Sequence, residues 1–522
     1  MSRLGSGERN LPKAKAREGR ASGNSVTNEP DVAKSMNKKI LLTSVCRPMG
    51  PKYGDAPSVG YELLYRQVTR PRHLQPAHGE DIHFSLEYIA ENLEEPVVGN
   101  YFVAAYPPFS AWDSAQVPAL HAALARPASA APLGIYVHLP FCQEKCDFCY
   151  LLSYIAQSAE VVDRYLDALV QEMALYSESP GVKGRPVSFA YFGGGTPSTL
   201  SSAQVRRLGD GLRRALAWDR IEEVTFECAP RSVRREFLET LREIGVTRVS
   251  MGVQSFDNEL LRLNGRVHLA EDVSRAYGLI REAGFGWVNL DLMVGLIGET
   301  EEKWRESVRR VIELGPDSVT IYQTEIPHNT QLYRDLKSGA LPAAPIPWDT
   351  KRARLDEGFR ELERAGYTVV SAYNTVKDPQ RHRYLYRDFL WRGADMLGLG
   401  VAAFGYFGGV HFQNEVTLEK YQAAVERGEL PVKRAFELSA HDQVVRQFVL
   451  QLKLGEVPAA PFRARFGVDI TEAFAQPLQA LAAEGWLTWS DDAVRLTRQG
   501  LLRVDRLLPR FYDSHFRDVR YT

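Results

Sequence analysis

Three of the five cysteines in the chain lie within one short run, Cys142-Gln-Glu-Lys-Cys146-Asp-Phe-Cys149. Cysteine thiolates can hold a 4Fe-4S cluster, and three such ligands leave one iron without a protein bond, open to a small molecule. A structural zinc site is the alternative, but it normally needs four protein ligands. No fourth cysteine lies near the run, so the spacing predicts an iron–sulfur centre with one open corner.

The length and composition of the chain limit the classes of protein to which it can belong. A chain of 522 residues can bury a large core and is long enough for more than one domain. Its 64 basic and 65 acidic residues give no electrostatic reason to expect a nucleic-acid partner. Few cysteines, mostly clustered, indicate a reducing compartment and metal ligation rather than disulfides. With no long apolar run or basic leader, we expect a soluble, cytoplasmic protein without a membrane span.

The N-terminal part changes character twice. Residues 1–38 are rich in Lys, Arg, Gly, Ser and Asn, which predicts a disordered tail. Its positive charge could also contact RNA or a membrane, but the lack of interleaved aromatic residues favours a solvated tail. Residues 39–130 form an N-terminal extension that begins with a predicted strand at 40–45 and ends in a Pro- and Ala-rich linker at 126–133.

From residue 133 to about 323 apolar strands and amphipathic helices alternate six times. The predicted strands begin near Leu133, Val187, Glu223, Thr247, Trp287 and Ser318. The first helix carries its apolar stripe on Val162, Tyr165, Leu166, Leu169, Val170 and Met173. Repeated βα units require a parallel sheet with right-handed crossovers, and in such barrels the chemistry lies at the C-terminal strand ends. We therefore expect an α/β fold with a partial (β/α)6 barrel.

The cysteine spacing C-x3-C-x2-C after an apolar strand resembles that of the radical S-adenosylmethionine (radical SAM) superfamily. Two stretches, Tyr136-Val-His-Leu-Pro-Phe-Cys142 and Tyr191-Phe-Gly-Gly-Gly-Thr-Pro197, resemble one branch of it. That branch contains oxygen-independent coproporphyrinogen III dehydrogenase, the related haem chaperone and the class C radical SAM methyltransferases. The resemblance runs from about residue 133 to the C-terminus.

The resemblance implies a domain order after the extension. A TIM-like radical SAM partial barrel would occupy 131–330, and a family-specific extension packing on it would occupy 331–430. A helical, winged-helix-like cap would occupy 431–522. A winged helix could bind DNA, but the sequence has no clustered basic face there, so we expect the cap to close over the substrate.

The resemblance also implies cofactors and binding residues. A 4Fe-4S cluster would be held by the three cysteines, two molecules of S-adenosyl-L-methionine would bind, and a reductant such as flavodoxin or ferredoxin would supply electrons. The positions that match the family's nucleotide sites are Tyr136, Phe148, Gly194, Gly195, Thr196, Glu227, Gln254, Arg266, Asp291, Tyr322, Thr324, Glu325 and Phe404. Tyr136 and Glu325 are also the candidate catalytic residues.

Four of these features can be weighed from residue chemistry. The glycines at 193–195 would let a backbone approach a ligand, although alone such a run is more often a tight turn. Glu227, at a strand end, could bind a ribose or an ammonium group or simply form a salt bridge at the rim. The guanidinium of Arg266 can hold a carboxylate with two hydrogen bonds, and Asp291 lies in so apolar a strand that it needs a partner. Cys228 is expected to pack in the core rather than act as a ligand.

Two departures from the sequence patterns of the family bear on which reaction the protein is expected to carry out. Leu151 stands where the dehydrogenase has a further cysteine, and the run 386–391 lacks the His-Asn pair of the chaperone's motif. These departures favour a class C methyltransferase, in which a methyl or methylene group passes to an sp2 carbon of an aromatic or tetrapyrrole-like substrate. Oxidation of a coproporphyrinogen and non-enzymatic haem binding stay open as alternatives. The strand and loop from residue 39 resemble a cobalamin-binding module but lack its Asp-x-His-x-x-Gly motif, so cobalamin is not expected.

Overall fold

The computed structural model describes residues 95–517, all of which belong to one compact unit spanning 76–522. The predicted tail at 1–38 and the predicted strand at 40–45 lie outside the described residues, and the extension is described only from residue 95 onward.

Twelve strands form the main sheet, in the order β14-β13-β12-β11-β1-β4-β5-β6-β7-β8-β10-β9. Their bounds are β1 (Leu133–Leu139), β4 (Val187–Gly194), β5 (Glu223–Cys228), β6 (Arg248–Gln254), β7 (Trp287–Val294), β8 (Ser318–Gln323), β9 (Thr368–Val369), β10 (Asn374–Val376), β11 (Asp395–Leu399), β12 (Phe404–Phe407), β13 (Val410–Asn414) and β14 (Val432–Glu437). The short strands β2 (Phe141–Cys142) and β3 (Tyr154–Ile155) pair separately beside β1.

Strands β1 and β4 to β8 pair in parallel, each with the next, and they begin within a residue of the six predicted starts. This confirms the six βα units. Strand β11 adds a seventh parallel strand beside β1. The segment 331–430 contributes β9 to β13 to this same sheet.

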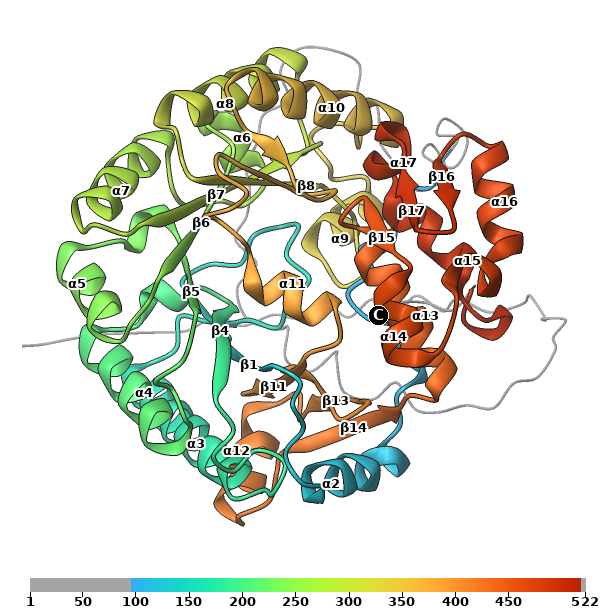
Figure 1. Ribbon diagram of the computed structural model, residues 1–522. Helices are drawn as coiled ribbons and strands as arrows, with labels where there is room; N and C mark the ends of the chain where they lie inside the picture. Colours follow the sequence, from blue (N-terminus) through green and yellow to red (C-terminus); the bar gives the residue numbers. More distant parts are fainter. Residues whose placement is uncertain (1–94, 518–522) are drawn as a thin grey trace, which may run out of the picture. The chain divides into compact units, whose positions relative to one another are not determined.

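The helices between the strands cover the outer side of the sheet (Figure 1). They are α3 (Ala159–Ser177), α4 (Ser202–Ala215), α5 (Arg235–Glu243), α6 (Asn258–Leu263), α7 (Ala270–Glu282) and α8 (Glu301–Leu314). The predicted stripe of α3 is its packed face: Tyr165, Leu166, Leu169 and Met173 are buried in the main hydrophobic core. α8 has clear end signals, with the Thr300 side chain accepting from the Lys303 N–H and a left-handed Gly315 at its C-terminus.

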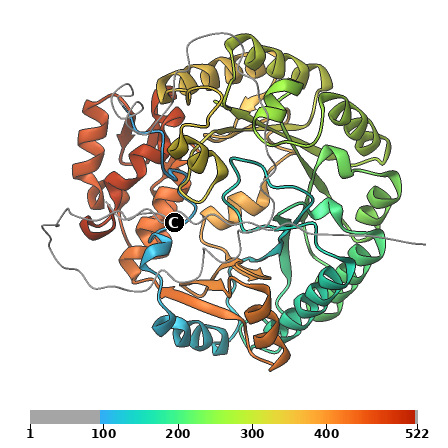
Figure 2. The same ribbon diagram turned by 180° about the vertical axis from the view of Figure 1, so that it is seen from behind.

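One helix, α11 (Leu385–Trp391), lies inside the ring of strands in both Figure 1 and Figure 2. Tyr386 packs on Tyr191 with ring centroids 4.7 Å apart, and Phe389 stacks on Phe189 at 5.6 Å. The backbone N–H of Leu385 donates to the Glu223 carboxylate at 2.7 Å. Because Phe189 and Glu223 lie early in β4 and β5, α11 fills the N-terminal end of the barrel interior.

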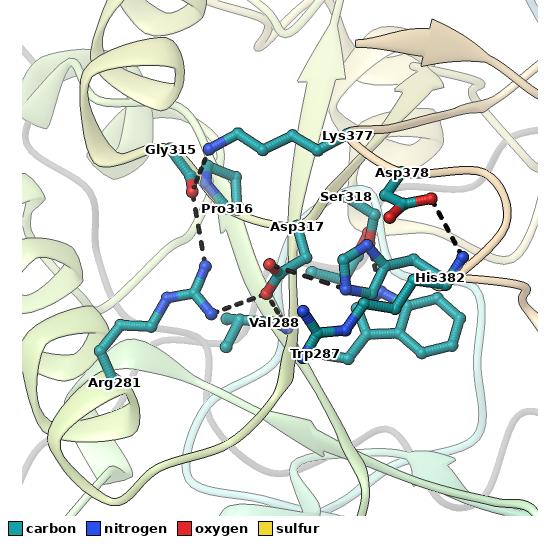
Figure 3. A network of polar contacts seen from close by, with 12 residues as sticks. Arg281, Trp287, Val288, Gly315, Pro316, Asp317, Ser318, Lys377, Asp378 and His382 are labelled. Atoms are coloured by element: carbon teal, nitrogen blue, oxygen red, sulfur yellow. Dashed lines mark hydrogen bonds and ion pairs between the residues drawn. The ribbon is translucent and has the colours of Figure 1, made fainter. Parts of the chain in front are cut away.

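The loop leading into α11 is tied to the start of β8, as Figure 3 shows. Asp317 accepts a hydrogen bond from Arg281 at 2.6 Å and from the Val288 N–H at 2.9 Å, and its other oxygen lies 3.8 Å from His382. Lys377 donates to the Gly315 carbonyl at 2.8 Å. These contacts hold the loop against the bottom of the barrel and so fix where α11 enters.

The remaining elements flank the barrel. They are α2 (Val117–Ala125), α9 (Gln331–Ser338), α10 (Trp348–Arg364) and α12 (Leu418–Glu426), then α13 (Ala440–Leu452), α14 (Ala460–Phe466), α15 (Ile470–Ala473), α16 (Ala475–Ala483), α17 (Arg498–Leu502) and α18 (Val504–Leu507). Beyond α13, β15 (Glu456–Pro458), β16 (Leu487–Ser490) and β17 (Ala493–Leu496) form a three-stranded sheet. Helices with a small antiparallel sheet are the arrangement expected of a winged-helix-like cap. Within 95–517, no helix combines the length and apolar character needed to cross a membrane.

Candidate functional site

The three clustered cysteines follow β1 at the C-terminal end of the barrel. Cys142 ends β2, and its sulfur accepts a hydrogen bond from the Thr196 hydroxyl at 3.4 Å. The sulfur of Cys146 accepts from a guanidinium N–H of Arg266 at 3.1 Å. Burial raises the pKa of the Cys149 thiol to about 11 and also raises that of Cys142. Two predicted nucleotide-site residues, Thr196 and Arg266, therefore touch the cysteine loop directly.

The glycine turn after β4 packs against that loop. The Gly195 N–H donates to the Leu139 carbonyl and the Thr196 N–H to the Phe141 carbonyl, both at 2.8 Å. A Cβ on Gly195 would lie 2.7 Å from the Phe141 carbonyl oxygen, and one on Gly194 would lie 2.5 Å from the His138 ring. Glycine is required here so that two backbone segments can touch, a reason that the sequence alone did not supply.

Solvent reaches a set of positions on the inner face of the barrel, the face opposite the helices. These positions are Tyr136, Tyr191, Glu227, Gly252, Gln254, Asp291, Met293 and Tyr322. The residues that alternate with them along the strands, such as Val137, Phe192 and Ile321, are buried in the main core. Tyr322 is 41% exposed, yet burial by surrounding groups raises its pKa well above its usual value. We call the space inside the barrel that these solvent-accessible positions face the hollow.

Two carboxyl groups face this hollow. Glu227 accepts hydrogen bonds from the Tyr191 hydroxyl at 2.6 Å and from the Gly194 N–H at 3.2 Å. Burial raises the pKa of Glu227 to about 7, and the charge of Asp291 adds to this rise. Burial also raises the pKa of Asp291, to about 6, against the attraction of Arg248. Both groups therefore change charge close to neutral pH, as is common in functional sites.

Tyr136 stands beside these groups on β1. Its hydroxyl lies 3.0 Å from Nδ1 of His138, and its ring lies 6.1 Å from that of Tyr191 in a stacked arrangement. Burial raises the pKa of Tyr136 and lowers that of His138 to about 4. The pair is therefore a neutral phenol next to a neutral imidazole.

Backbone strain also collects at the C-terminal end of the barrel. In the part of the chain that the structure describes, the non-glycine residues with positive φ are Ala156, Gln254 and Ala402, at 49°, 68° and 58°. Ala156 bonds to the Cys142 carbonyl, Gln254 ends β6, and Ala402 follows β11. Such conformations cost about 1–3 kcal/mol each and occur mostly at functional sites. The buried Oε1 of Gln254 has no hydrogen-bond partner among residues 95–517.

Glu325 lies just beyond β8. Its carboxylate accepts from the Tyr101 N–H at 3.1 Å, and burial raises its pKa to about 8. The preceding residue, Thr324, donates its hydroxyl to the Val294 carbonyl at 3.0 Å and receives the Lys351 amine on its own carbonyl at 2.6 Å. Burial lowers the pKa of Lys351 to about 7.

Two predicted residues pack in aromatic surroundings near the mouth. Phe148, inside the cysteine loop, packs against a small hydrophobic cluster around Leu332 and Trp348. Phe404, at the start of β12, packs on Phe109 with ring centroids 4.3 Å apart. Cys228 is 5% exposed within the main core, as expected of a packed residue.

Sequence reasoning missed several residues of the site. Asn289 lies two positions before the predicted Asp291 on the same strand, so the period-two alternation of a strand could have found it. Tyr191 lies three positions before the predicted Gly194, so the same rule does not single it out. Tyr101 and Lys351 come from other segments of the chain, and only folding brings Tyr101 to the Glu325 carboxylate and Lys351 to the neighbouring Thr324 carbonyl.

The chain is similar to proteins of one family over most of its described length. The radical SAM superfamily model matches residues 136–311, and the HemN C-terminal domain matches residues 438–503. Oxygen-independent coproporphyrinogen III oxidase of Escherichia coli is 30% identical over 401 residues, covering 74% of this chain and 86% of that protein. Heme chaperone HemW of Bacillus subtilis is 30% identical over 370 residues, covering 70% and 96%. The solved structure of E. coli coproporphyrinogen III oxidase (HemN), a radical SAM enzyme, has 26% identity and a TM-score of 0.69, covering 81% and 100%.

The chain therefore belongs to the radical SAM superfamily. Its similarity is to the branch of oxygen-independent coproporphyrinogen III oxidase and HemW, it is a radical SAM enzyme, and its fold is the α/β radical SAM partial barrel with a helical C-terminal region. Membership implies a 4Fe-4S cluster and S-adenosylmethionine.

The donor set fits such a cluster, because three thiols share one loop and two of their sulfurs accept hydrogen bonds, a contact that tunes iron–sulfur centres. Among residues 95–517 the structure groups no three Cys, His, Asp or Glu side chains closely enough to hold a metal ion.

Proposed function

We propose that this enzyme cleaves S-adenosylmethionine and removes hydrogen from a conjugated, tetrapyrrole-like substrate, oxidising it in the manner of its coproporphyrinogen oxidase relatives. The observation that carries the proposal is the extent of the similarity, which covers the whole HemN chain and includes the C-terminal domain as well as the barrel. A shared barrel alone would support the superfamily but no substrate class.

The residues of the mouth have distinct proposed tasks. The cluster would be held by Cys142, Cys146 and Cys149. When bound, the cluster would supply the electron that cleaves S-adenosylmethionine. The carboxylates of Glu227 and Asp291 face the hollow and suit an ammonium group or ribose hydroxyls. Both lose part of their charge near neutral pH, so nucleotide binding would strengthen as the pH rises through this range.

Tyr136 and Glu325 are the proposed catalytic residues. Glu325 keeps its proton at neutral pH because burial raises its pKa to about 8, so it could donate a proton to a substrate carboxylate or hydroxyl at the mouth. Tyr136 would hold a neutral phenol against the nucleotide. The positions that would contact the two S-adenosylmethionine molecules are Gln254, Arg266 and Asp291. The second molecule would lie toward Tyr322, Thr324, Glu325 and Phe404, and a flavodoxin or ferredoxin would act as reductant.

Methyl or methylene transfer to an sp2 carbon is the second candidate, and one observation favours it. Leu151 occupies the position two residues after Cys149 and is 38% exposed, next to the 39% exposed Tyr150. An apolar side chain there removes a thiol next to the cluster loop and leaves a surface that suits an aromatic substrate.

One anaerobic experiment separates these reactions. Reconstituted enzyme is incubated with S-adenosylmethionine, a reductant and coproporphyrinogen III, and the products are analysed by mass spectrometry. The proposal predicts 5′-deoxyadenosine together with decarboxylated tetrapyrrole: the adenosyl radical takes one hydrogen atom, CO2 leaves, and the second electron passes to a one-electron acceptor such as oxidised flavodoxin or ferredoxin. S-adenosylhomocysteine with a methylated product would instead establish methyl transfer. Stoichiometric haem retention when the protein is purified, followed by no nucleoside formation in the assay, would establish a chaperone.

A further inference from the structure

A fully buried amide, Asn289 on β7, lies directly beneath Asp291. Its Nδ2 donates to the Asp291 Oδ1 at 2.7 Å and to the Ser250 hydroxyl at 3.0 Å. Its Oδ1 accepts from the hydroxyls of Ser318 at 2.8 Å and Thr320 at 3.1 Å. The amide thus uses both donors and both acceptor sites, and it joins three strands inside the barrel.

This arrangement fixes the carboxylate of Asp291. A side-chain amide with all its hydrogen-bonding groups engaged cannot turn without breaking several buried bonds. The hydroxyl of Ser250 lies 3.4 Å from the other oxygen of Asp291, so both carboxylate oxygens have neutral donors from below. The side of the carboxylate facing the hollow is the side left for a ligand.

The charged and titratable groups around Asp291 come from four elements. Arg248 on β6 attracts its charge, and Glu227 on β5 repels it. Tyr322 on β8 and Tyr384 before α11 also interact electrostatically with it. In the described part of the chain none of these groups forms an ion pair with Asp291. The shortest hydrogen bond to this carboxylate there is the one that the Asn289 amide donates, at 2.7 Å.

We propose that Asn289 is a positioning residue of the nucleotide site: it holds Asp291 ionised and oriented toward an ammonium or hydroxyl group of S-adenosylmethionine. This inference rests on the proposed function, which places the nucleotide in the hollow. Without that task the polar cluster would serve only to join β6, β7 and β8.

An isosteric substitution separates the two roles. Asn289→Asp keeps the bonds from Ser318 and Thr320 to Oδ1, so the strands stay joined. It also puts a second carboxyl oxygen against Asp291 at the 2.7 Å contact. Two carboxyl groups at this distance share a proton, which raises the apparent pKa of the pair by about 1–2 units. Ser250→Ala is a milder variant that removes one of the hydroxyl donors to Asp291 and leaves that of Thr320 in place.

The first measurement is the affinity for S-adenosylmethionine as a function of pH. Wild-type affinity should fall in two steps as the pH drops, first near 7 where Glu227 takes up a proton and then near 6 where Asp291 does. The lower midpoint is the one that reports on Asp291. The midpoint should move up in Asn289→Asp, which lowers the affinity at pH 7 about two- to ten-fold and restores it near pH 9. Ser250→Ala should shift the midpoint in the same direction by less. An unchanged midpoint, or an equal loss at every pH, would overturn the positioning role.

A second readout separates failure of this inference from failure of the proposed function. If Asp291→Asn binds S-adenosylmethionine like wild type, the nucleotide assignment of Asp291 is wrong. The titration of Asp291 itself, followed by its 13C carboxyl resonance with Asp291→Asn as reference, then decides the matter. If the titration midpoint of Asp291 is the same in wild type and in Asn289→Asp, the inference is contradicted. If Asn289→Asp does not fold, the titration midpoint in Ser250→Ala is compared with wild type in the same way.

Discussion

Removal of one hydroxyl should weaken nucleotide binding in a pH-dependent way. In Tyr191→Phe, Glu227 loses the 2.6 Å hydrogen bond to its Oε1. A hydrogen bond to a charged group contributes about 1.5–3 kcal/mol, so its loss should raise the pKa of Glu227 by at least about 1 unit. Starting from about 7, the ionised fraction at pH 7 falls from about one half to about one tenth.

If the carboxylate of Glu227 binds the nucleotide, the affinity of Tyr191→Phe at pH 7 should be about five-fold lower than wild type. At pH 9 both proteins carry an ionised Glu227, and their affinities should agree within about two-fold. Anaerobic equilibrium dialysis with labelled S-adenosylmethionine measures both values, with Glu227→Gln as the variant that cannot recover at high pH. Equal binding at pH 7, or a loss that persists unchanged at pH 9, would refute this reasoning.

Three further predictions concern metal, packing and stability. Alanine at any of the three loop cysteines should abolish iron binding and nucleoside formation, whereas Cys228→Ala should keep both, as measured by iron analysis and chromatography. Gly195→Ala places a methyl group against two backbone carbonyls and should lower the free energy of unfolding by about 1–3 kcal/mol, while Gly278→Ala, in open space within α7, should not lower it. Burial raises the pKa of Glu172 to about 7, so the folded state favours the protonated carboxyl group. This stabilisation is fully present at a pH below the ordinary pKa of a glutamate and is lost as the pH rises through 7. The free energy of unfolding should therefore fall about 3 kcal/mol more between pH 5 and pH 8 in wild type than in Glu172→Gln, and equal slopes in urea titrations would contradict this.

The fold was largely predictable because its signals are local. Apolar runs of strand length and helical stripes mark the six βα units, and parallel pairing follows from their alternation. The outer strands were not predictable in this way. Strands β9 and β10 are two and three residues long, too short for a periodic pattern, and their place in the sheet depends on pairing with distant segments.

The site was predictable where its residues share a short motif and not where it is assembled from distant ones. The sequence alone predicted the cysteine loop and the glycine turn as parts of the site. The structure adds that glycine is needed in the turn because two backbone segments touch there. The partners of Glu325, Tyr101 and Lys351, lie 224 and 26 positions away along the chain and meet it only through tertiary packing. Buried polar groups such as Asn289 look like ordinary strand residues until their neighbours are known.

The central claim is that a 4Fe-4S cluster with an open iron site lies at the mouth of this barrel and binds S-adenosylmethionine directly. Electron paramagnetic resonance of the anaerobically reconstituted and reduced protein, recorded with and without S-adenosylmethionine, tests it most directly. The account predicts a 4Fe-4S signal that changes when the nucleotide is added. Protein that carries zinc in place of iron, or an iron signal that the nucleotide leaves unchanged, would contradict it.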